Sequence, residues 1–409
     1  MKILILTQYY PPETGAPQNR LSSLATNMKS LGASVEILTA FPNYPSLIKH
    51  EKYRHRLRSN IENIDGINVH RTYIYANGKS GFIYRLVNYF SFVFSSLIYG
   101  IFKTGRYDII ICESPPLFLG ITSIILKKIK NAKLVLNISD LWPLSIERLG
   151  VVKNRFLLNI AYRLEKFIYK RSDYISAQTD GIKRYIENIF PNKKFLLFRN
   201  GIDVNFFRRI ENQNMRLPFD IDRDANDLVI TYTGNFGYAQ GLERIVSVAK
   251  KIESINKNIK FVLIGDGPLK DEISILVQEK KISNVAIHGS IDRKCLKLVW
   301  EKSDIALIPI IKNELFKGAI PSKIFEALYY KKPILTSLQG EAYDIFISRA
   351  NCGIWFDMDS DTDIINKILN LYMNYNKIQT LGKNGHDFII KNFNRTDLIK
   401  EFYNFINSN

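Results

Sequence analysis

The chain has 409 residues, of which 46% are hydrophobic and 23% charged, and this composition excludes a disordered, collagen-like or disulfide-scaffold protein. Its three cysteines are too few and too scattered for a disulfide framework or a zinc cluster, which predicts a protein of a reducing cytoplasm. The formal charge of +18 is unevenly distributed along the chain. Residues 1–200 hold 29 Lys and Arg against 13 Asp and Glu, whereas residues 201–409 hold 28 against 26. The first half is therefore expected to meet nucleic acid, phospholipid or a pyrophosphate-bearing substrate, although a codon bias toward lysine would also raise the charge.

In the first half, short aliphatic runs alternate with longer stretches of helical period. The first run, at 2–7, has only four consecutive aliphatic residues, so it predicts a buried strand rather than a secretory leader. Further strands are expected at 34–39, 107–112, 133–138, 174–177 and 195–198. Continuous apolar strands separated by helices indicate a parallel sheet covered on both faces.

Two loops that follow strands of this half carry candidate site residues. Gly15 stands near the start of the helix after the first strand, where backbone N–H groups can approach a phosphate. Asp140 follows the strand at 133–138, where its carboxylate could accept a proton from a substrate hydroxyl or hold that hydroxyl in place. The alternative for Asp140 is an N-cap of the next helix.

Two helical stretches of the first half are candidates for membrane contact. Residues 86–102 are uncharged and rich in aromatic side chains, but they are short and too often interrupted by serine for a spanning helix. We expect this helix to lie partly in the core and partly against a bilayer. Residues 155–171 alternate apolar and basic side chains at helical spacing, as in a helix at a lipid interface, and an ordinary surface helix would show the same pattern.

The second half repeats the alternation of strands and helices after a polar stretch at 201–227, which is interpreted as a linker. Strands are expected at 228–233, 260–264, 285–288, 304–309 and 333–336. Two such series predict two Rossmann-like domains in tandem, in an α/β protein.

Glycine-bearing loops follow three strands of the second half, at 233–241, 265–268 and 316–327. Converging backbone amides together with a lysine suit a diphosphate. Lys323 and Glu326 are three residues apart on a predicted helix and project to one face, so the lysine could take phosphate and the carboxylate ribose hydroxyls. A surface ion pair between them is the alternative. The Asp-x-Asp pairs lie in loops and the five histidines form no ligand-spaced cluster, so no metal site is predicted.

Taken together, the tandem pattern and the motifs Gly234…Gly241, Gly265-Asp266-Gly267-Pro268 and Pro321-Ser322-Lys323-x-x-Glu326 resemble family 4 glycosyltransferases with the GT-B fold. The resemblance runs over essentially the whole chain. More narrowly, Phe41-Pro42-Asn43-Tyr44-Pro45 and Asp140-Leu141-Trp142-Pro143 look like motifs of transferases of O-antigen and capsule assembly, which include N-acetyl-L-fucosamine transferases. The expected fold is GT-B, with two Rossmann-like domains whose parallel sheets face each other across a cleft.

The resemblance implies retaining, metal-independent transfer of a sugar from a UDP-sugar, without any cofactor. Residues 201–387 would bind the donor, residues 1–200 the acceptor, and a last helix at about 388–409 would pack back on the first domain. Glu326 would hold the ribose, Lys323 the diphosphate, Gly15 would lie beneath the distal phosphate and His288 beside the base. The other donor-binding candidates are Gly234, Asn235, Gln240, Gly265, Asp266, Gly318, Ala319, Ile320, Pro321 and Ser322. Asn43, Tyr44 and Trp142 are acceptor-binding candidates, and Asp140 joins Lys323 and Glu326 as a catalytic candidate.

Three positions depart from the family pattern. Gly318 stands where the first of two glutamates is usual, and Asn235 and Gln240 stand where an arginine and a lysine would clamp the diphosphate. Backbone amides of 318–322 would then read the sugar hydroxyls. A 6-deoxy sugar, which has one hydroxyl fewer to recognise, would be compatible with the missing carboxylate.

A polyprenyl-diphosphate-linked acceptor would account for the basic, aromatic first half. The enzyme is then expected on the anionic cytoplasmic face of the plasma membrane, with contacts at 49–58, 86–102 and 155–171, and without a nucleic-acid partner. The alternatives are a GT-B nucleotide-sugar 2-epimerase and a non-catalytic protein that binds sugar nucleotides.

Overall fold

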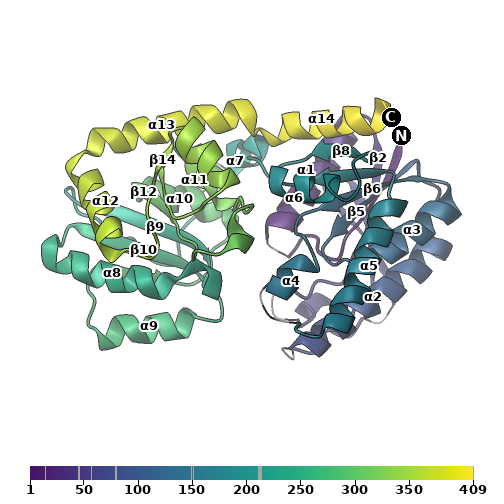
Figure 1. Ribbon diagram of the computed structural model, residues 1–409, viewed down its shortest axis with the longest axis horizontal. Coiled ribbons are helices and arrows are strands. Elements are labelled where there is room, and N and C mark those ends of the chain that lie inside the picture. The colour runs from purple at the N-terminus through teal and green to yellow at the C-terminus, as the bar shows by residue number, and fades with distance from the viewer. Residues whose placement is uncertain are drawn as a thin grey trace. The chain divides into compact units, whose positions relative to one another are not determined.

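The computed structural model describes residues 1–409 except for 14, 45–46, 57, 79–80, 149, 151, 211–213 and 409, and it leaves out the side chains of Phe82 and Leu315. The chain forms two α/β units (Figure 1). The first unit contains residues 1–200 together with 396–409, and the second contains residues 201–395.

The first unit is built on an eight-stranded sheet with the strand order β3-β4-β2-β1-β5-β6-β7-β8. Its neighbouring strands are parallel except for the pair β3 and β4, which is antiparallel. The strands are β1 Lys2–Leu6, β2 Ser34–Ala40, β3 Asn60–Ile64, β4 Ile67–Thr72, β5 Ile109–Ser114, β6 Lys133–Ile138, β7 Tyr174–Ala177 and β8 Lys194–Leu197.

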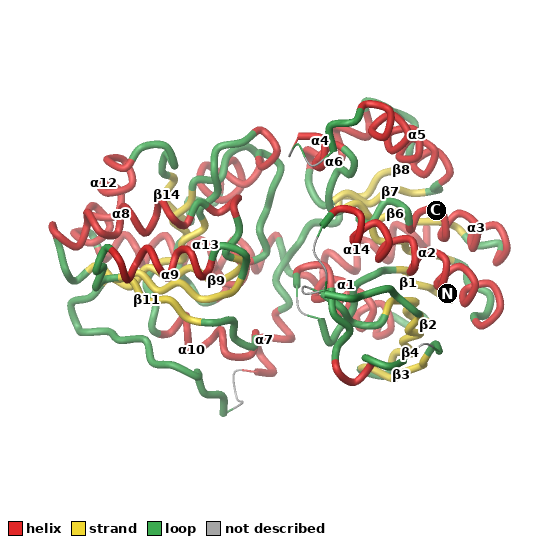
Figure 2. Tube along the Cα trace, turned by 90° about the horizontal axis from the view of Figure 1, so that it is seen from below, coloured by secondary structure: helices red, strands yellow, loops and turns green. Residues whose placement is uncertain are grey.

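Helices cover both faces of this sheet because successive strand residues point to opposite sides. Ile3 and Ile5 pack against α1 (Ala16–Ser30) and α14 (Arg395–Ser408). Leu4 and Leu6 belong to the cluster on the other face, which is covered by α2 Phe82–Lys103, α3 Leu119–Lys130, α5 Arg155–Arg171 and α6 Asp180–Glu187. The short helix α4 spans Leu144–Arg148. In Figure 2 the strands form a layer between these helices.

The second unit has six parallel strands in the order β11-β10-β9-β12-β13-β14. The strands are β9 Leu228–Asn235, β10 Ile259–Asp266, β11 Val285–His288, β12 Ile305–Ile308, β13 Ile334–Thr336 and β14 Gly353–Trp355. This is the 3-2-1-4-5-6 order of dinucleotide-binding sheets, whose ligands bind at the carboxyl ends of the strands.

Helices also cover both faces of the second sheet. One core cluster contains residues of α8 Leu242–Ile255, α9 Lys270–Glu279 and α12 Asp361–Met373. The other contains residues of α7 Val204–Ile210, α10 Leu296–Glu301 and α11 Lys323–Tyr329, and α13 Tyr375–Asn392 contributes to both. Short 3-10 turns lie at Glu51–Tyr53, Tyr238–Gln240, Arg293–Cys295 and Glu314–Phe316, and a π-helical segment at Tyr343–Arg349.

Three expectations need correction. The hairpin of β3 and β4 and the short strand β14 were not foreseen, because β3 alternates polar and apolar residues at a sheet edge instead of forming an aliphatic run. The stretch 201–227 is not only a linker, because α7 buries Val204, Phe207 and Ile210 in the second unit. The segment that returns to the first unit begins at 396 rather than at about 388, because α13 packs within the second unit.

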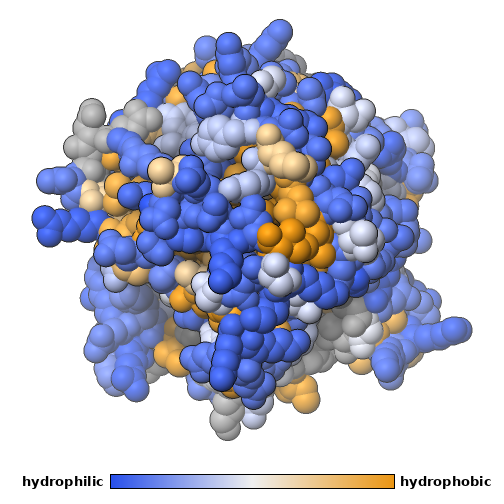
Figure 3. Space-filling model, turned by 90° about the vertical axis from the view of Figure 1, so that its left-hand side faces the viewer, coloured by the Kyte–Doolittle hydropathy of each residue, from blue (hydrophilic) through white to orange (hydrophobic). Residues whose placement is uncertain are grey.

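Helix α2 is the one described helix that is long and apolar enough to cross a membrane, by length and composition alone. Only 28% of its most apolar window is buried in the protein. As expected, one side of α2 lies in the core, with Phe92 and Val93. The other side leaves Ile83, Phe94 and Phe102 exposed. By contrast, the face of the second unit shown in Figure 3 is mostly hydrophilic, with apolar residues in small patches.

Candidate functional site

Two glycine loops meet at the carboxyl ends of β9 and β10 in the second unit. Because these strands are in parallel register, Gly234 pairs with Gly265 and Asn235 with Asp266. Gly265 has a φ of +154°, and a Cβ atom there would lie 1.7 Å from the carbonyl oxygen of Gly234. The backbone N–H of Phe236 donates to the carbonyl of Asp266 at 2.8 Å. The two loops therefore form one edge, which only glycine at position 265 allows.

Lys323, the first residue of α11, points its ammonium at this edge. The ammonium nitrogen lies 4.0 Å from the centre of the Tyr232 ring, and a Cβ atom at Gly234 would stand 2.6 Å from it. In the described part of the chain no carboxylate forms an ion pair with it. Burial lowers the pKa of Lys323 to about 7, although the charge of Glu326 opposes this shift. An anion placed here would stabilise the ammonium form of the lysine.

Glu326 is held by an arginine rather than by Lys323. Its Oε1 atom accepts a hydrogen bond from Nε of Arg293 at 2.7 Å, and the guanidinium of Arg293 lies over the rings of Phe206 and Phe207. Within the described residues, Oε2 of Glu326 has no protein partner. The alternative of an ion pair between Lys323 and Glu326 is therefore wrong, and one carboxylate oxygen is free to accept from a ligand hydroxyl.

The loop that leads into α11 is partly exposed at Gly318, Ala319, Ile320, Pro321 and Ser322. The N–H of Ala319 is used internally, because it donates to the carbonyl of Phe316 at 2.9 Å. Among the described residues, the N–H groups of Gly318, Ile320 and Ser322 have no protein acceptor. These three groups can donate to the oxygens of a ligand, whereas the N–H of Ala319, which was expected to do the same, cannot.

The remaining donor-binding candidates differ in accessibility. Asn235 and Asp266 are exposed residues and are paired at the same edge of the sheet. Oδ1 of Asp266 accepts a hydrogen bond from the N–H of Gly267 at 2.8 Å. Gln240 turns back on its own loop, where Oε1 accepts from the N–H of Gly237 at 3.2 Å. Gln240 therefore shapes the loop instead of reaching outward as a cationic clamp would.

His288 ends β11 and stacks on Phe219, with ring centres 3.7 Å apart and planes inclined by 7°. Its Nε2 atom is buried and has no hydrogen-bond partner among the described residues. Burial lowers the pKa of His288, so the ring is neutral at neutral pH. Phe219 is a neighbour that the sequence pattern did not single out, since it lies in the stretch interpreted as a linker.

In the first unit, Glu13 holds the loop after β2 in place. The Oε1 atom of Glu13 accepts hydrogen bonds from the N–H groups of Asn43 at 2.7 Å and Tyr44 at 2.8 Å. Asn43 is 2% exposed, and its amide bonds to Phe41 and Asn88. The expectation that Asn43 contacts an acceptor is therefore corrected, because its side chain is consumed in holding the loop. Tyr44 is 49% exposed and available, whereas Pro45 of the same motif lies outside the described residues.

Asp140 and Trp142 lie in the loop after β6. Trp142 packs edge-on against Phe118, with ring centres 5.1 Å apart. Asp140 is an exposed residue, and partial loss of hydration raises the pKa of its carboxyl, opposed by the Ser145 side chain and the Leu141 backbone. Asp140 lies at the carboxyl end of β6, as expected from the sequence.

Comparisons with known proteins match both units. Residues 15–201 match the Glycosyl transferase 4-like domain, and residues 214–388 match the Glycosyl transferases group 1 family. An uncharacterized glycosyltransferase of Methanocaldococcus jannaschii, MJ1069, is 21% identical over 98% of this chain and 97% of its own. The putative colanic acid biosynthesis glycosyl transferase WcaI of Escherichia coli is 24% identical over 80% of this chain and 81% of its own. The crystal structure of Anabaena Alr3699/HepE in complex with UDP superposes with a TM-score of 0.68 at 14% identity, covering all of both chains.

The chain is a family 4 glycosyltransferase with the GT-B fold. The predicted enzyme class and fold class are thereby confirmed.

The glycosyltransferase also contains a buried polar cluster that the sequence pattern did not reveal. Arg20 of α1 is 1% exposed and forms an ion pair with Glu113 at the end of β5, with a nitrogen–oxygen distance of 2.5 Å. The same guanidinium donates to Ser139 at 2.7 Å and to Asn200 at 3.1 Å. This cluster fixes the helix that begins at Gly15 to the carboxyl ends of β5 and β6. The signal in the sequence that could have revealed this cluster was an acidic residue at the carboxyl end of an aliphatic strand. The same kind of signal pointed to Asp140.

Gly15 itself lies at the N-terminus of α1 with an extended backbone. A Cβ atom there would stand 2.5 Å from Oε1 of the buried Gln18, an oxygen with no hydrogen-bond partner among the described residues. The absence of a side chain at Gly15 thus makes room for the amide of Gln18 at the start of the helix.

Proposed function

We propose that this glycosyltransferase moves a sugar from a UDP-sugar to a polyprenyl-diphosphate-linked saccharide in O-antigen or capsule assembly. The best candidate for the sugar is N-acetyl-L-fucosamine or another N-acetylhexosamine. The relative WcaI is named for colanic acid biosynthesis and the structural neighbour HepE was crystallised with UDP, which supports a UDP-sugar donor and a polysaccharide product.

The observation that carries the proposal is the unpaired Lys323 ammonium at the open edge formed by Gly234 and Gly265. A diphosphate placed there would gain a charge-assisted hydrogen bond from Lys323 and backbone donors from Gly318, Ile320 and Ser322. The free Oε2 of Glu326 would accept from ribose hydroxyls. His288, neutral and with an unpartnered Nε2, would lie beside the base.

The proposed chemistry is a front-face substitution at the anomeric carbon. The bond from this carbon to the β-phosphate oxygen of UDP breaks, while a bond to the acceptor hydroxyl oxygen forms on the same face. The acceptor proton passes to the departing phosphate oxygen, and the anomeric configuration is retained. Lys323 and the loop amides stabilise the charge that develops on the leaving group, and Asp140 would hold the acceptor hydroxyl. We propose that this step proceeds without a metal ion.

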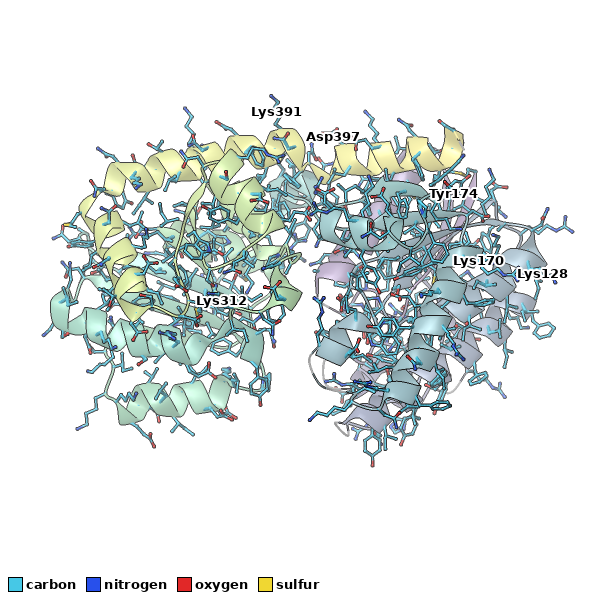
Figure 4. All side chains as sticks on the ribbon, in the orientation of Figure 1. Lys128, Lys170, Tyr174, Lys312, Lys391 and Asp397 are labelled. Carbon is cyan, nitrogen blue, oxygen red and sulfur yellow. The ribbon has the colours of Figure 1, made fainter. Side chains whose placement is uncertain are left out.

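The first unit offers a surface suited to a lipid-linked acceptor on the cytoplasmic face of the plasma membrane. Helix α3 packs between α2 and α5 on one side of this unit (Figure 1). Exposed apolar side chains on α2 and α5 include Phe94, Phe102 and Phe156. Lys128 and Lys170 extend from α3 and α5 (Figure 4), and such a mixture of apolar and basic residues suits an anionic bilayer.

The test is to mix the enzyme with a synthetic polyprenyl-diphosphate N-acetylglucosamine and a panel of UDP-sugars, and to follow the mass of the lipid product. A product heavier by one N-acetyl-deoxyhexose supports the donor, the acceptor and the transfer together. Transfer of another sugar keeps the mechanism and rejects the fucosamine assignment. An epimerised donor without a lipid product supports the epimerase alternative, and absence of turnover with intact UDP binding supports the non-catalytic one.

A further inference from the structure

The first unit contains a pocket that the proposed sugar transfer does not use. It has a volume of about 540 Å³, which is within the range of small-molecule sites. The pocket lies between the last turns of α2 and the end of β4, and Thr72, Tyr73, Ile98, Tyr99 and Phe102 are among its lining residues.

The interior of this pocket is suited to hydrocarbon. Two of its polar lining groups already have partners in the protein: Oγ of Ser95 donates to the carbonyl of Tyr73 at 2.5 Å, and the hydroxyl of Tyr99 bonds to Nδ1 of His70 at 3.0 Å. Between these groups, a ligand would contact the aliphatic and aromatic surface of Ile98, Tyr99 and Phe102. Apolar chains gain free energy from leaving water for such a site.

The pocket opens onto the exposed apolar side of α2. Ile98 and Phe102 line the pocket and are 60% and 76% exposed. Together with Ile83, Val87 and Phe94, which are also exposed, they recur at intervals of four or seven residues, so they lie along one stripe of the helix. A hydrocarbon chain could pass from a bilayer against this stripe into the pocket.

One cationic residue lines the pocket, and the ammonium of another lies over a lining ring. Lys103, an exposed residue, lines the pocket beside Phe102, and the ammonium of Lys49 lies 4.6 Å from the ring centre of Tyr73. Arg58 is exposed and precedes the lining residue Ser59. An apolar interior with a basic mouth is complementary to a lipid that carries an anionic headgroup.

The position on α2 favours a bilayer lipid over the acceptor. Asn88 of α2 bonds to Asn43 in the loop that presents Tyr44, whereas Phe102 lies fourteen residues further along the helix, a distance of about 20 Å at the helical rise. An acceptor diphosphate bound beside Tyr44 would therefore not reach Lys103. Lys103 is thus left available to the phosphate of another lipid.

We propose that this pocket binds one acyl chain of an anionic phospholipid, whose phosphate lies at Lys103 and Lys49. The inference rests on the membrane part of the proposed function and adds a stoichiometric lipid site to it. Such a site would anchor the first unit through a single bound lipid in addition to general contact with the bilayer.

The test uses short-chain phosphatidylglycerol kept below its micelle concentration, titrated into the full chain by calorimetry, with phosphatidylcholine of equal chain length as a comparison. General adsorption to a bilayer predicts no binding of lipid monomers, whereas the pocket predicts saturable binding of one phosphatidylglycerol. Ile98→Trp, which fills the mouth, is expected to weaken binding about tenfold or more. Ile83→Trp is the matched control on the same stripe outside the pocket, and it should bind as the parent does.

Lys103→Gln is expected to reduce the preference for phosphatidylglycerol by roughly threefold, as for one partly exposed ion pair. Unchanged binding by the Ile98→Trp protein, or no saturable binding by the parent, would overturn the proposal. Tighter binding of farnesyl diphosphate than of phosphatidylglycerol would also overturn it, in favour of the acceptor's prenyl chain. UDP binding by the parent protein is measured in parallel. A protein that binds lipid but not UDP rejects the proposed donor site, whereas a protein that binds UDP but not lipid rejects only the lipid pocket.

Discussion

The ammonium of Lys323 lies 4.0 Å from the centre of the Tyr232 ring, and this contact connects the first turn of α11 to β9. It places the lysine where a Cβ atom at residue 234 would almost touch it. The cation–π contact replaces some of the hydration that the ammonium loses, but it supplies no negative charge. The site is therefore organised for an anion before any anion is bound.

Removal of this ammonium is expected to impair donor binding and turnover. Lys323→Met keeps most of the side-chain volume, and it should weaken UDP-sugar binding by about tenfold or more and reduce turnover by about a hundredfold, because the leaving diphosphate loses its cation. Lys317→Met is the control, since Lys317 lies on the same loop but pairs with Glu314. Equal activities of the two variants in a product assay, with equal melting temperatures, would show that Lys323 has no part in catalysis.

Donor binding is expected to depend on pH through the same lysine. Burial lowers the pKa of Lys323 to about 7 in the free enzyme, and a bound diphosphate raises it again. The protonated form binds better, so affinity should fall as pH rises above about 7, by at most about tenfold per pH unit. Calorimetry with a UDP-sugar at pH 6 to 9 measures this slope. Lys323→Arg, which stays charged, should flatten it, and an equally steep slope in that variant would assign the titration to another group.

Glu326 is expected to act on the ribose rather than on the phosphates. Its Oε1 atom is fixed by Arg293 at 2.7 Å, which leaves Oε2 for ribose hydroxyls. Glu326→Gln should therefore weaken binding of UDP several-fold but leave binding of inorganic diphosphate unchanged, whereas Lys323→Met should weaken both. Competition titrations with the two ligands separate these effects. A parallel loss of both ligands in the Glu326 variant would indicate that the carboxylate acts only through the shape of the loop.

The sequence predicted most of the fold, because buried parallel strands form continuous aliphatic runs that can be seen without tertiary information. β3 was missed since an edge strand needs only one apolar face, and its NIENI pattern matches no such run. The sequence predicted which residues belong to the candidate site, but not the contacts that these residues make. Lys323 and Glu326 were found from their motif, but the partner of Glu326 is Arg293, which another element supplies. Burial of Asn43 was equally invisible, because it depends on Glu13 and Asn88 closing around the loop.

The glycine at 265 should be essential to stability. Its φ is +154°, and the carbonyl oxygen of Gly234 lies 1.7 Å from the point that a Cβ atom would occupy, so an added methyl group collides with backbone and cannot be relieved by a side-chain rotation. Gly265→Ala is expected to destabilise the second unit by more than about 2 kcal/mol. Gly289→Ala is the control, since the nearest atom to its Cβ would be the flexible end of Lys270 at 3.7 Å. Thermal unfolding compares the two, and similar midpoints would contradict the close approach of β9 and β10.

Glu165 is expected to make stability depend on pH in the first unit. This residue of α5 is fully buried, its Oε1 atom accepts from the hydroxyl of Tyr169 at 2.9 Å, and its Oε2 atom has no partner among the described residues. Burial raises the pKa of its carboxyl from 4.5 to about 7.

The folded state therefore holds this proton at pH values where the unfolded chain has released it. The free energy of unfolding should fall between pH 4.5 and about 7, by an amount on the order of 1–3 kcal/mol, and then level off. Glu165→Gln carries no titrating proton, so it should lose this slope and be more stable than the parent at pH 8. Glu187→Gln is the control, because Glu187 lies on α6 as a half-buried partner of Lys183. Denaturant unfolding across this pH range measures the effect, and a slope that persists in the Glu165→Gln protein would place the buried proton elsewhere.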